Sequence, residues 1–128
     1  MLEGTFCHLP GIGPKTERRL WAEGFVHWLD LLRALESGRA PVRCGKGVRE
    51  GLEDSLDSLS RNDSAYFAER LPGDQMWRLF PAFRGQTAYV DIETTGLGGG
   101  LDHITSVALY DGSQAVTYVH GENLERFE

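Results

Sequence analysis

Residues 87–97 read Thr-Ala-Tyr-Val-Asp-Ile-Glu-Thr-Thr-Gly-Leu. The β-branched and aromatic residues at the start of this stretch predict a strand over Thr87–Glu93. Side chains two residues apart on a strand point to the same face, so we expect Asp91 and Glu93 side by side at the strand's end. Carboxylates this close repel each other unless a cation lies between them, and oxygen ligands with open water positions suit Mg²⁺ or Mn²⁺. The pattern therefore predicts a strand that ends in a pair of metal ligands.

The last seven residues of this stretch resemble the first motif of the DEDD, or DnaQ-like, superfamily of metal-dependent 3′-to-5′ exonucleases, which have a ribonuclease-H-like fold. The resemblance implies hydrolysis of phosphodiester bonds at a DNA or RNA 3′ end, with two Mg²⁺ or Mn²⁺ ions in the complete site. It implies that Asp91 and Glu93 are catalytic metal ligands and that Thr94, Thr95 and Leu97 lie near the terminal nucleotide. The alternative, from the residues alone, is a solvated strand end with two surface acids.

The resemblance covers only part of such a catalytic site. The later motifs of the superfamily supply two further aspartates and a histidine or tyrosine general base, and residues 98–128 contain no convincing replacement. Asp102 and Asp111 are expected in a loop and a turn, and His103 and His120 are interpreted as surface residues. We therefore expect this chain to be an incomplete part of a longer enzyme, inactive by itself.

Two further strands are predicted after the motif, Ile104–Tyr110 and Ala115–His120, joined by a turn at Asp111-Gly112. The predicted fold class is α+β to α/β. It consists of an N-terminal helical hairpin region, a helical spacer and the first three antiparallel strands of a ribonuclease-H-like domain. An open edge of that sheet could also pair with a second copy or another protein, which makes a protein-interaction fragment one alternative function.

Near the N-terminus, Leu-Pro-Gly-Ile-Gly at residues 9–13 precedes Pro14 and predicts a tight turn that leads into a helix, Lys15 to about Glu23. It resembles the turn of helix-hairpin-helix motifs, in which glycines let backbone N–H groups approach a phosphate. The resemblance implies nucleic-acid contacts from five residues: Gly11, Gly13, Lys15, Arg18 and Arg19. The residues before the turn look extended, so the usual leading helix is missing. A turn that only packs two helices is the alternative.

Composition divides the chain into a helix-hairpin-helix-like region (1–38), a helical spacer (39–84) and the start of the ribonuclease-H-like domain (85–128). The order of hairpin, spacer and acidic motif extends the resemblance over nearly all 128 residues, to the bacterial YprB-like family of ribonuclease-H-like exonucleases. A non-catalytic nucleic-acid-binding module that uses the Gly-Ile-Gly hairpin is the other alternative function.

Helical periodicity supports the first two regions. A second helix is predicted near His27–Leu35, and an apolar stripe begins at Val48 in the spacer. Asp63 or Ser64 is expected to cap a short helix. A last helix is predicted over Gln75 to about Phe83, where Pro81 limits its regularity. Its aromatic residues are interpreted as a surface that packs against the following sheet, with a ligand-binding role as the alternative: Trp77, Phe80 and Phe83.

The net charge of −6 is unevenly distributed. Residues 1–50 carry eight Lys and Arg against six acids, whereas residues 51–128 carry five against thirteen, so positive charge that could attract phosphate is concentrated in the N-terminal part. No apolar run approaches the ~20 residues that cross a membrane, and the start lacks a signal-peptide pattern. We therefore expect a cytoplasmic protein without membrane contact, in which Cys7 and Cys44 are reduced.

Overall fold

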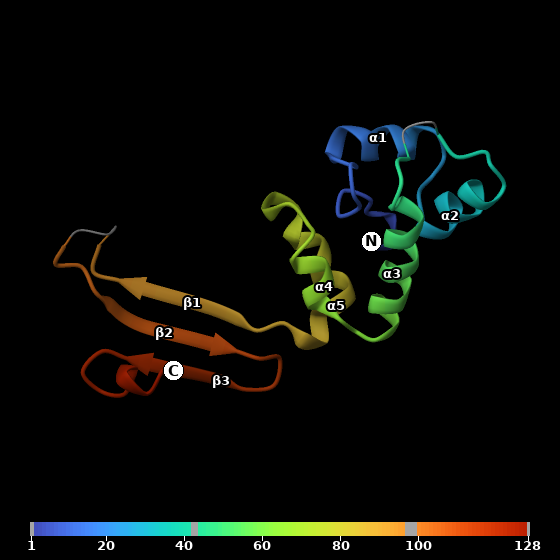
Figure 1. The fold of residues 1–128 in the computed structure, drawn as a ribbon. Helices are drawn as coiled ribbons and strands as arrows, with labels where there is room; N and C mark the ends of the chain where they lie inside the picture. Colours follow the sequence, from blue (N-terminus) through green and yellow to red (C-terminus); the bar gives the residue numbers. More distant parts are fainter. Residues whose placement is uncertain (1, 42–43, 97–99, 128) are drawn as a thin grey trace. The chain divides into compact units, whose positions relative to one another are not determined.

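The computed structural model describes residues 2–41, 44–96 and 100–127. The chain divides into two compact units, Met1–Arg84 and Gly85–Glu128. The first unit contains the α-helices and the second contains a small antiparallel sheet (Figure 1). The protein is therefore of mixed α+β architecture, which is the coarser part of the predicted fold class. No helix in the described part of the chain has the length and apolar character to cross a membrane.

The helical unit follows the predicted order closely. Pro14 occupies the first turn of its first helix, where its fixed φ and missing N–H cost nothing. Asp63 caps the fourth helix as predicted, because its carboxylate accepts the Tyr66 N–H at 3.2 Å. The α-helices are α1 (Pro14–Ala22), α2 (Trp28–Glu36), α3 (Val48–Ser60), α4 (Ser64–Ala68) and α5 (Phe80–Phe83).

The last predicted helix differs from expectation in its form. Instead of one α-helix, the chain forms a 3₁₀ segment, Gly73–Leu79, followed by the single turn of α5. Pro81 lies in that turn and has no N–H for an intrahelical bond, which explains why a regular helix does not run through it. A short 3₁₀ turn, Arg84–Gln86, then leads to the sheet.

An aromatic stack forms the centre of the helical unit. Trp28 and Phe67 are fully buried, and their rings lie parallel with centroids 5.7 Å apart. Phe83 packs against Phe67 at 5.8 Å, which confirms its core position. Trp77 is 68% exposed and Phe80 is 40% exposed, so neither belongs to this stack, and their packing against the sheet stays a prediction. The Trp28 indole also donates to the Thr5 carbonyl at 2.7 Å and so fixes the N-terminal loop to the core.

The sheet is the predicted meander, with strand order β1-β2-β3 and antiparallel neighbours. Its strands are β1 (Tyr89–Thr94), β2 (Ile104–Tyr110) and β3 (Ala115–Val119). Asp111 lies in the β2–β3 turn as expected. Its carboxylate accepts hydrogen bonds from the Gln114 and Ser113 N–H groups and the Ser113 hydroxyl, which lower the pKa of Asp111 to about 2.

Candidate metal site and nucleic-acid interface

The register of the sheet places the two motif carboxylates on one face near the end of β1. Asp91 lies opposite Ala108, and Glu93 lies opposite Ser106. Both acids are exposed, and neither takes part in an ion pair among the described residues. Because their cross-strand neighbours are small, the space above the two carboxylates is not filled from β2. This face is therefore open to a ligand and carries two uncompensated negative charges.

The donor set fits a hard divalent cation in part. Carboxylate oxygens are the ligands that Mg²⁺ and Mn²⁺ take from proteins, and no lysine or arginine pairs with this pair of acids in the described chain. No group of three or more histidine, cysteine, aspartate or glutamate side chains able to hold a metal occurs among the described residues. Asp91 and Glu93 can thus supply two ligands, and the remaining ligands would come from water, substrate or other groups.

The turn after β1 is held by its two threonines. The Thr94 hydroxyl donates to the Gly96 carbonyl at 2.6 Å. Thr95 spans the base of the β1–β2 connection, since its N–H donates to the His103 carbonyl and its hydroxyl accepts the His103 N–H. The Thr95 N–H is therefore engaged within the loop and does not point a free donor at a nucleotide. Leu97, the remaining motif residue, lies outside the described residues.

Two pairs of residues near this strand end lie together in a way that sequence reasoning missed. A Cβ at Gly96 would lie 2.5 Å from an Asp102 oxygen, so the glycine permits close approach of that carboxylate. The His103 and His120 rings pack with centroids 4.7 Å apart at the end of the sheet where β1 finishes. His103 precedes β2 and His120 follows β3, and antiparallel pairing of these strands brings the two positions together. The predicted meander could therefore have predicted this contact.

In the helical unit, the Gly-Ile-Gly turn leads directly into α1. Gly11 has a φ of +73°, a conformation that favours glycine. Gly13 is the N-cap of α1 and has no side chain to cap it, so the first-turn N–H groups find no acceptor in the N-cap side chain. Lys15, Arg18 and Arg19 are exposed on α1 and join no ion pair among the described residues.

The opposite face of α1 contains a buried carboxylate that sequence reasoning also missed. Glu17 is 1% exposed and accepts the N–H groups of Phe6 at 2.6 Å and Cys7 at 3.1 Å. Arg78 completes the arrangement with Nη1 2.8 Å from the carboxylate. Burial, with the nearby Glu17 charge, raises the pKa of the Cys7 thiol to about 11. We call Glu17, Arg78 and the two N–H groups the Glu17 clamp. It fixes the loop before the hairpin to α1.

No family model, no curated protein and no solved structure matches this chain. The assignment of a function therefore depends on the geometry of these residues and on the resemblance of the acidic motif. The structure has three candidate functional features: the carboxylate pair on β1, the hairpin with the basic face of α1, and the open edges of the sheet. Self-association through β1 or β3 stays a prediction.

Proposed function

We propose that this chain carries the first metal-binding strand of a DEDD-type 3′-to-5′ exonuclease with ribonuclease-H-like topology. The observation that supports the proposal is the end of β1, where Asp91 and Glu93 share an exposed face without an ion pair in the described chain. The meander order β1-β2-β3 is the order with which such a domain begins. The substrate class is a DNA or RNA 3′ end, and the reaction is hydrolysis of its last phosphodiester bond.

Within this proposal, Asp91 and Glu93 would help to hold divalent ions, whose chemistry would be to activate a water and to stabilise the leaving 3′ oxygen. The chain's own contribution is to hold two ligands rigidly. Pairing with β2 fixes the backbone on which Asp91 and Glu93 lie, and the small side chains of Ala108 and Ser106 leave room for a phosphate above them. The shift in register between Glu93 and Thr94 ends the regular pairing there and turns the chain toward the loop. Two carboxylates position no general base, so we expect metal binding rather than efficient hydrolysis from this chain alone.

The test is Mn²⁺ binding, measured by electron paramagnetic resonance of free Mn²⁺ in a titration of the whole chain. Asp91→Asn keeps the size of the side chain and removes one of two charges, so we expect the Mn²⁺ affinity to fall by roughly tenfold or more. Glu122→Gln, at an exposed acid of the same unit, is the matched control and should bind like the wild type. Equal Mn²⁺ affinity of wild type and Asp91→Asn would overturn the proposal.

A second candidate function, non-catalytic binding of nucleic acid, is favoured by the hairpin. Gly11 in the left-handed region, the α1 N-terminus without a side-chain cap, and the basic face of α1, which joins no ion pair among the described residues, are together suited to a phosphate backbone. Such contacts would be independent of sequence and would survive both EDTA and Asp91→Asn. This function is compatible with the first, since an exonuclease also has to hold its substrate away from the cleaved bond.

The salt dependence of binding tests the hairpin. If Lys15 and Arg18 each neutralise one phosphate, replacing both with alanine should reduce the slope of log K against log salt by about 1.4 on a single strand. Arg33→Ala with Lys46→Ala removes the same charge from exposed positions outside α1 and should leave the slope nearly unchanged. An equal loss of slope in both double variants would show that general charge, not the hairpin, attracts the nucleic acid.

A further inference from the structure

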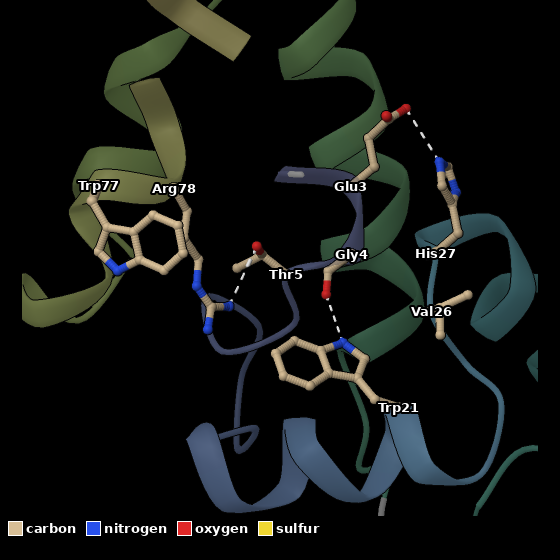
Figure 2. Close-up of a pocket in the computed structure, with 8 residues that line it drawn as sticks. All are labelled: Glu3, Gly4, Thr5, Trp21, Val26, His27, Trp77 and Arg78. Atoms are coloured by element: carbon tan, nitrogen blue, oxygen red, sulfur yellow. Dashed lines mark hydrogen bonds and ion pairs between the residues drawn. The ribbon is translucent and has the colours of Figure 1, made fainter. Parts of the chain in front are cut away.

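A cavity in the helical unit is lined by residues outside the Gly-Ile-Gly turn and outside the carboxylate pair. It has a volume of about 480 Å³ and lies between the N-terminal loop, the end of α1 and the 3₁₀ segment (Figure 2). Its walls include Thr5, Trp21, Val26, Trp77 and Arg78. Cavities of this size accommodate small organic groups, and their usual lining is aromatic and apolar with a few polar atoms.

The tryptophans of this cavity are unusually accessible for their size. Trp77 is 68% exposed and Trp21 is 36% exposed, although burial of an indole is strongly favourable. The guanidinium of Arg78 lies between them, 5.5 Å from the Trp21 ring centroid and 5.6 Å from that of Trp77 (Figure 2). The cavity therefore presents two indoles and a planar cation, all of which are surfaces on which a flat aromatic group can stack.

The polar groups of the cavity can both donate and accept. Arg78 uses Nη1 for the Glu17 clamp and for Thr5, whereas its Nε and Nη2 donate to no acceptor among the described residues. On the other side, the Glu3 carboxylate lies 3.4 Å from the His27 ring and retains acceptor capacity. A ligand that combines an aromatic plane with carbonyl and amino edges, as a nucleobase does, would be complementary to this set.

Charge outside the cavity favours a nucleic acid over a free heterocycle. Trp21 is three residues after Arg18 on α1, so the two side chains are neighbours on the helix surface. Arg18 belongs to the exposed basic face of α1, which also carries Lys15 and Arg19 without ion pairs in the described chain. A strand whose phosphates follow this face would bring its bases to the Trp21 side of the helix. That juxtaposition of cations and accessible indoles is the pattern of single-strand binding sites.

We propose that the Trp21–Trp77 cavity binds an unpaired base of a single-stranded nucleic acid, with the base stacked on an indole and its edge bonded to Arg78. The inference rests on the proposed function, because it specifies that the nucleic-acid substrate of that function is a strand with unpaired bases. Stacking of this kind tolerates every base, because each has a π-face. The site therefore distinguishes single strands from duplexes without reading sequence.

The experiment compares dissociation constants of a dye-labelled oligothymidylate of about ten nucleotides, measured by fluorescence anisotropy with EDTA present. Because Trp77 is mostly exposed, Trp77→Ala should leave the fold intact and weaken binding by roughly 5- to 100-fold. Trp77→Phe keeps a stacking surface and should recover most of the affinity. Phe80→Ala is the matched control, since Phe80 is 40% exposed and does not line the cavity.

A strand of the same length and charge without bases separates stacking from phosphate contact. We expect it to bind wild type about as weakly as the oligothymidylate binds Trp77→Ala. Equal binding of the two strands, or an unchanged dissociation constant in Trp77→Ala, would overturn the proposal. Because EDTA is present, none of these results depends on Asp91 and Glu93. Equal Mn²⁺ affinity of wild type and Asp91→Asn would therefore refute the nuclease proposal, and the base-binding measurements could still be interpreted.

Discussion

Replacing Glu17 with alanine is expected to lower the free energy of unfolding of the helical unit by about 3–5 kcal/mol. The variant leaves the Arg78 guanidinium, which is 14% exposed, without its carboxylate, and it leaves the N–H groups of Phe6 and Cys7 without an acceptor. Removing one partner of a buried pair costs more than the pair contributes, because the remaining charge stays desolvated. Since domains of this size are stable by only about 5–15 kcal/mol, this variant should be close to unfolded.

Urea unfolding followed by tryptophan fluorescence measures this effect, because all three tryptophans lie within Met1–Arg84 and report that unit alone. Glu23→Ala, at an exposed acid that follows α1, should change the free energy of unfolding by less than about 0.5 kcal/mol. A double variant with Glu17→Met and Arg78→Met removes both charges and should recover part of the loss. A cost below about 1 kcal/mol for Glu17→Ala would contradict the account of the Glu17 clamp.

The second large effect is a loss of stability in acid that originates at His8. This side chain is 5% exposed between Trp28 and Phe67, and burial, followed by the charge of Arg70, lowers its pKa from 6.5 to about 4. Between pH 4 and pH 6.5, His8 is therefore protonated in the unfolded chain and neutral in the folded unit. The stability that neutral His8 contributes is fully present above about pH 6.5. Below that pH the free energy of unfolding falls by about 1.4 kcal/mol per pH unit, so about 3 kcal/mol is lost by pH 4.

The hydrogen bonds around His8 explain why it stays neutral. The Ser55 hydroxyl donates to the Gly51 carbonyl, so at the 2.8 Å contact the His8 Nε2 is the donor. The other ring nitrogen, Nδ1, then carries no proton and has no hydrogen-bond partner in the described part of the chain. A second proton would have to be placed on that buried atom, near Arg70. His8 lines a cavity that Glu50 and Asp54 also line. The negative charges of these two acids would offset the cost of protonating His8 only in part.

Urea unfolding at pH 7 and pH 5, again followed by tryptophan fluorescence, checks the acid effect. His8→Leu cannot titrate and should lose most of the difference between the two pH values, whatever its stability at pH 7. His27→Gln, at a partly exposed histidine beside Glu3, is the control and should keep it. If His8→Leu showed the same difference as wild type, the acid sensitivity would have to originate elsewhere.

Local patterns predicted most of the secondary structure. The turn chemistry at Asp111-Gly112 and the strand propensity on both sides of it predicted β2 and β3, and the Asp63 cap predicted the start of α4. These features depend on residues within a few positions of one another. The broken helix at Pro81 was anticipated in part, because the missing N–H of proline is itself a local property.

The side-chain arrangements that control stability could not be predicted in the same way. The Glu17 clamp joins residues separated by 61 positions, and nothing in α1 alone shows which of its polar side chains faces inward with a partner. The place of Trp77 in the wall of an accessible cavity was equally unpredictable, because the other residues of that wall come from distant parts of the sequence. The candidate metal pair was predictable since it needs only the alternation of side chains along β1.

The Glu17 clamp also links the two ends of the helical unit. The Glu17 carboxylate accepts a hydrogen bond from the Phe6 N–H, which precedes it in the sequence, and pairs with Arg78 near the end of the unit. A fragment that began after the hairpin, or that stopped at the end of α4, would retain the buried acid and lose its counterpart. A peptide that contains only the hairpin and α1 would lose the Arg78 contact that helps to hold the loop against α1, even though the residues that would contact phosphate all lie within about ten positions of one another.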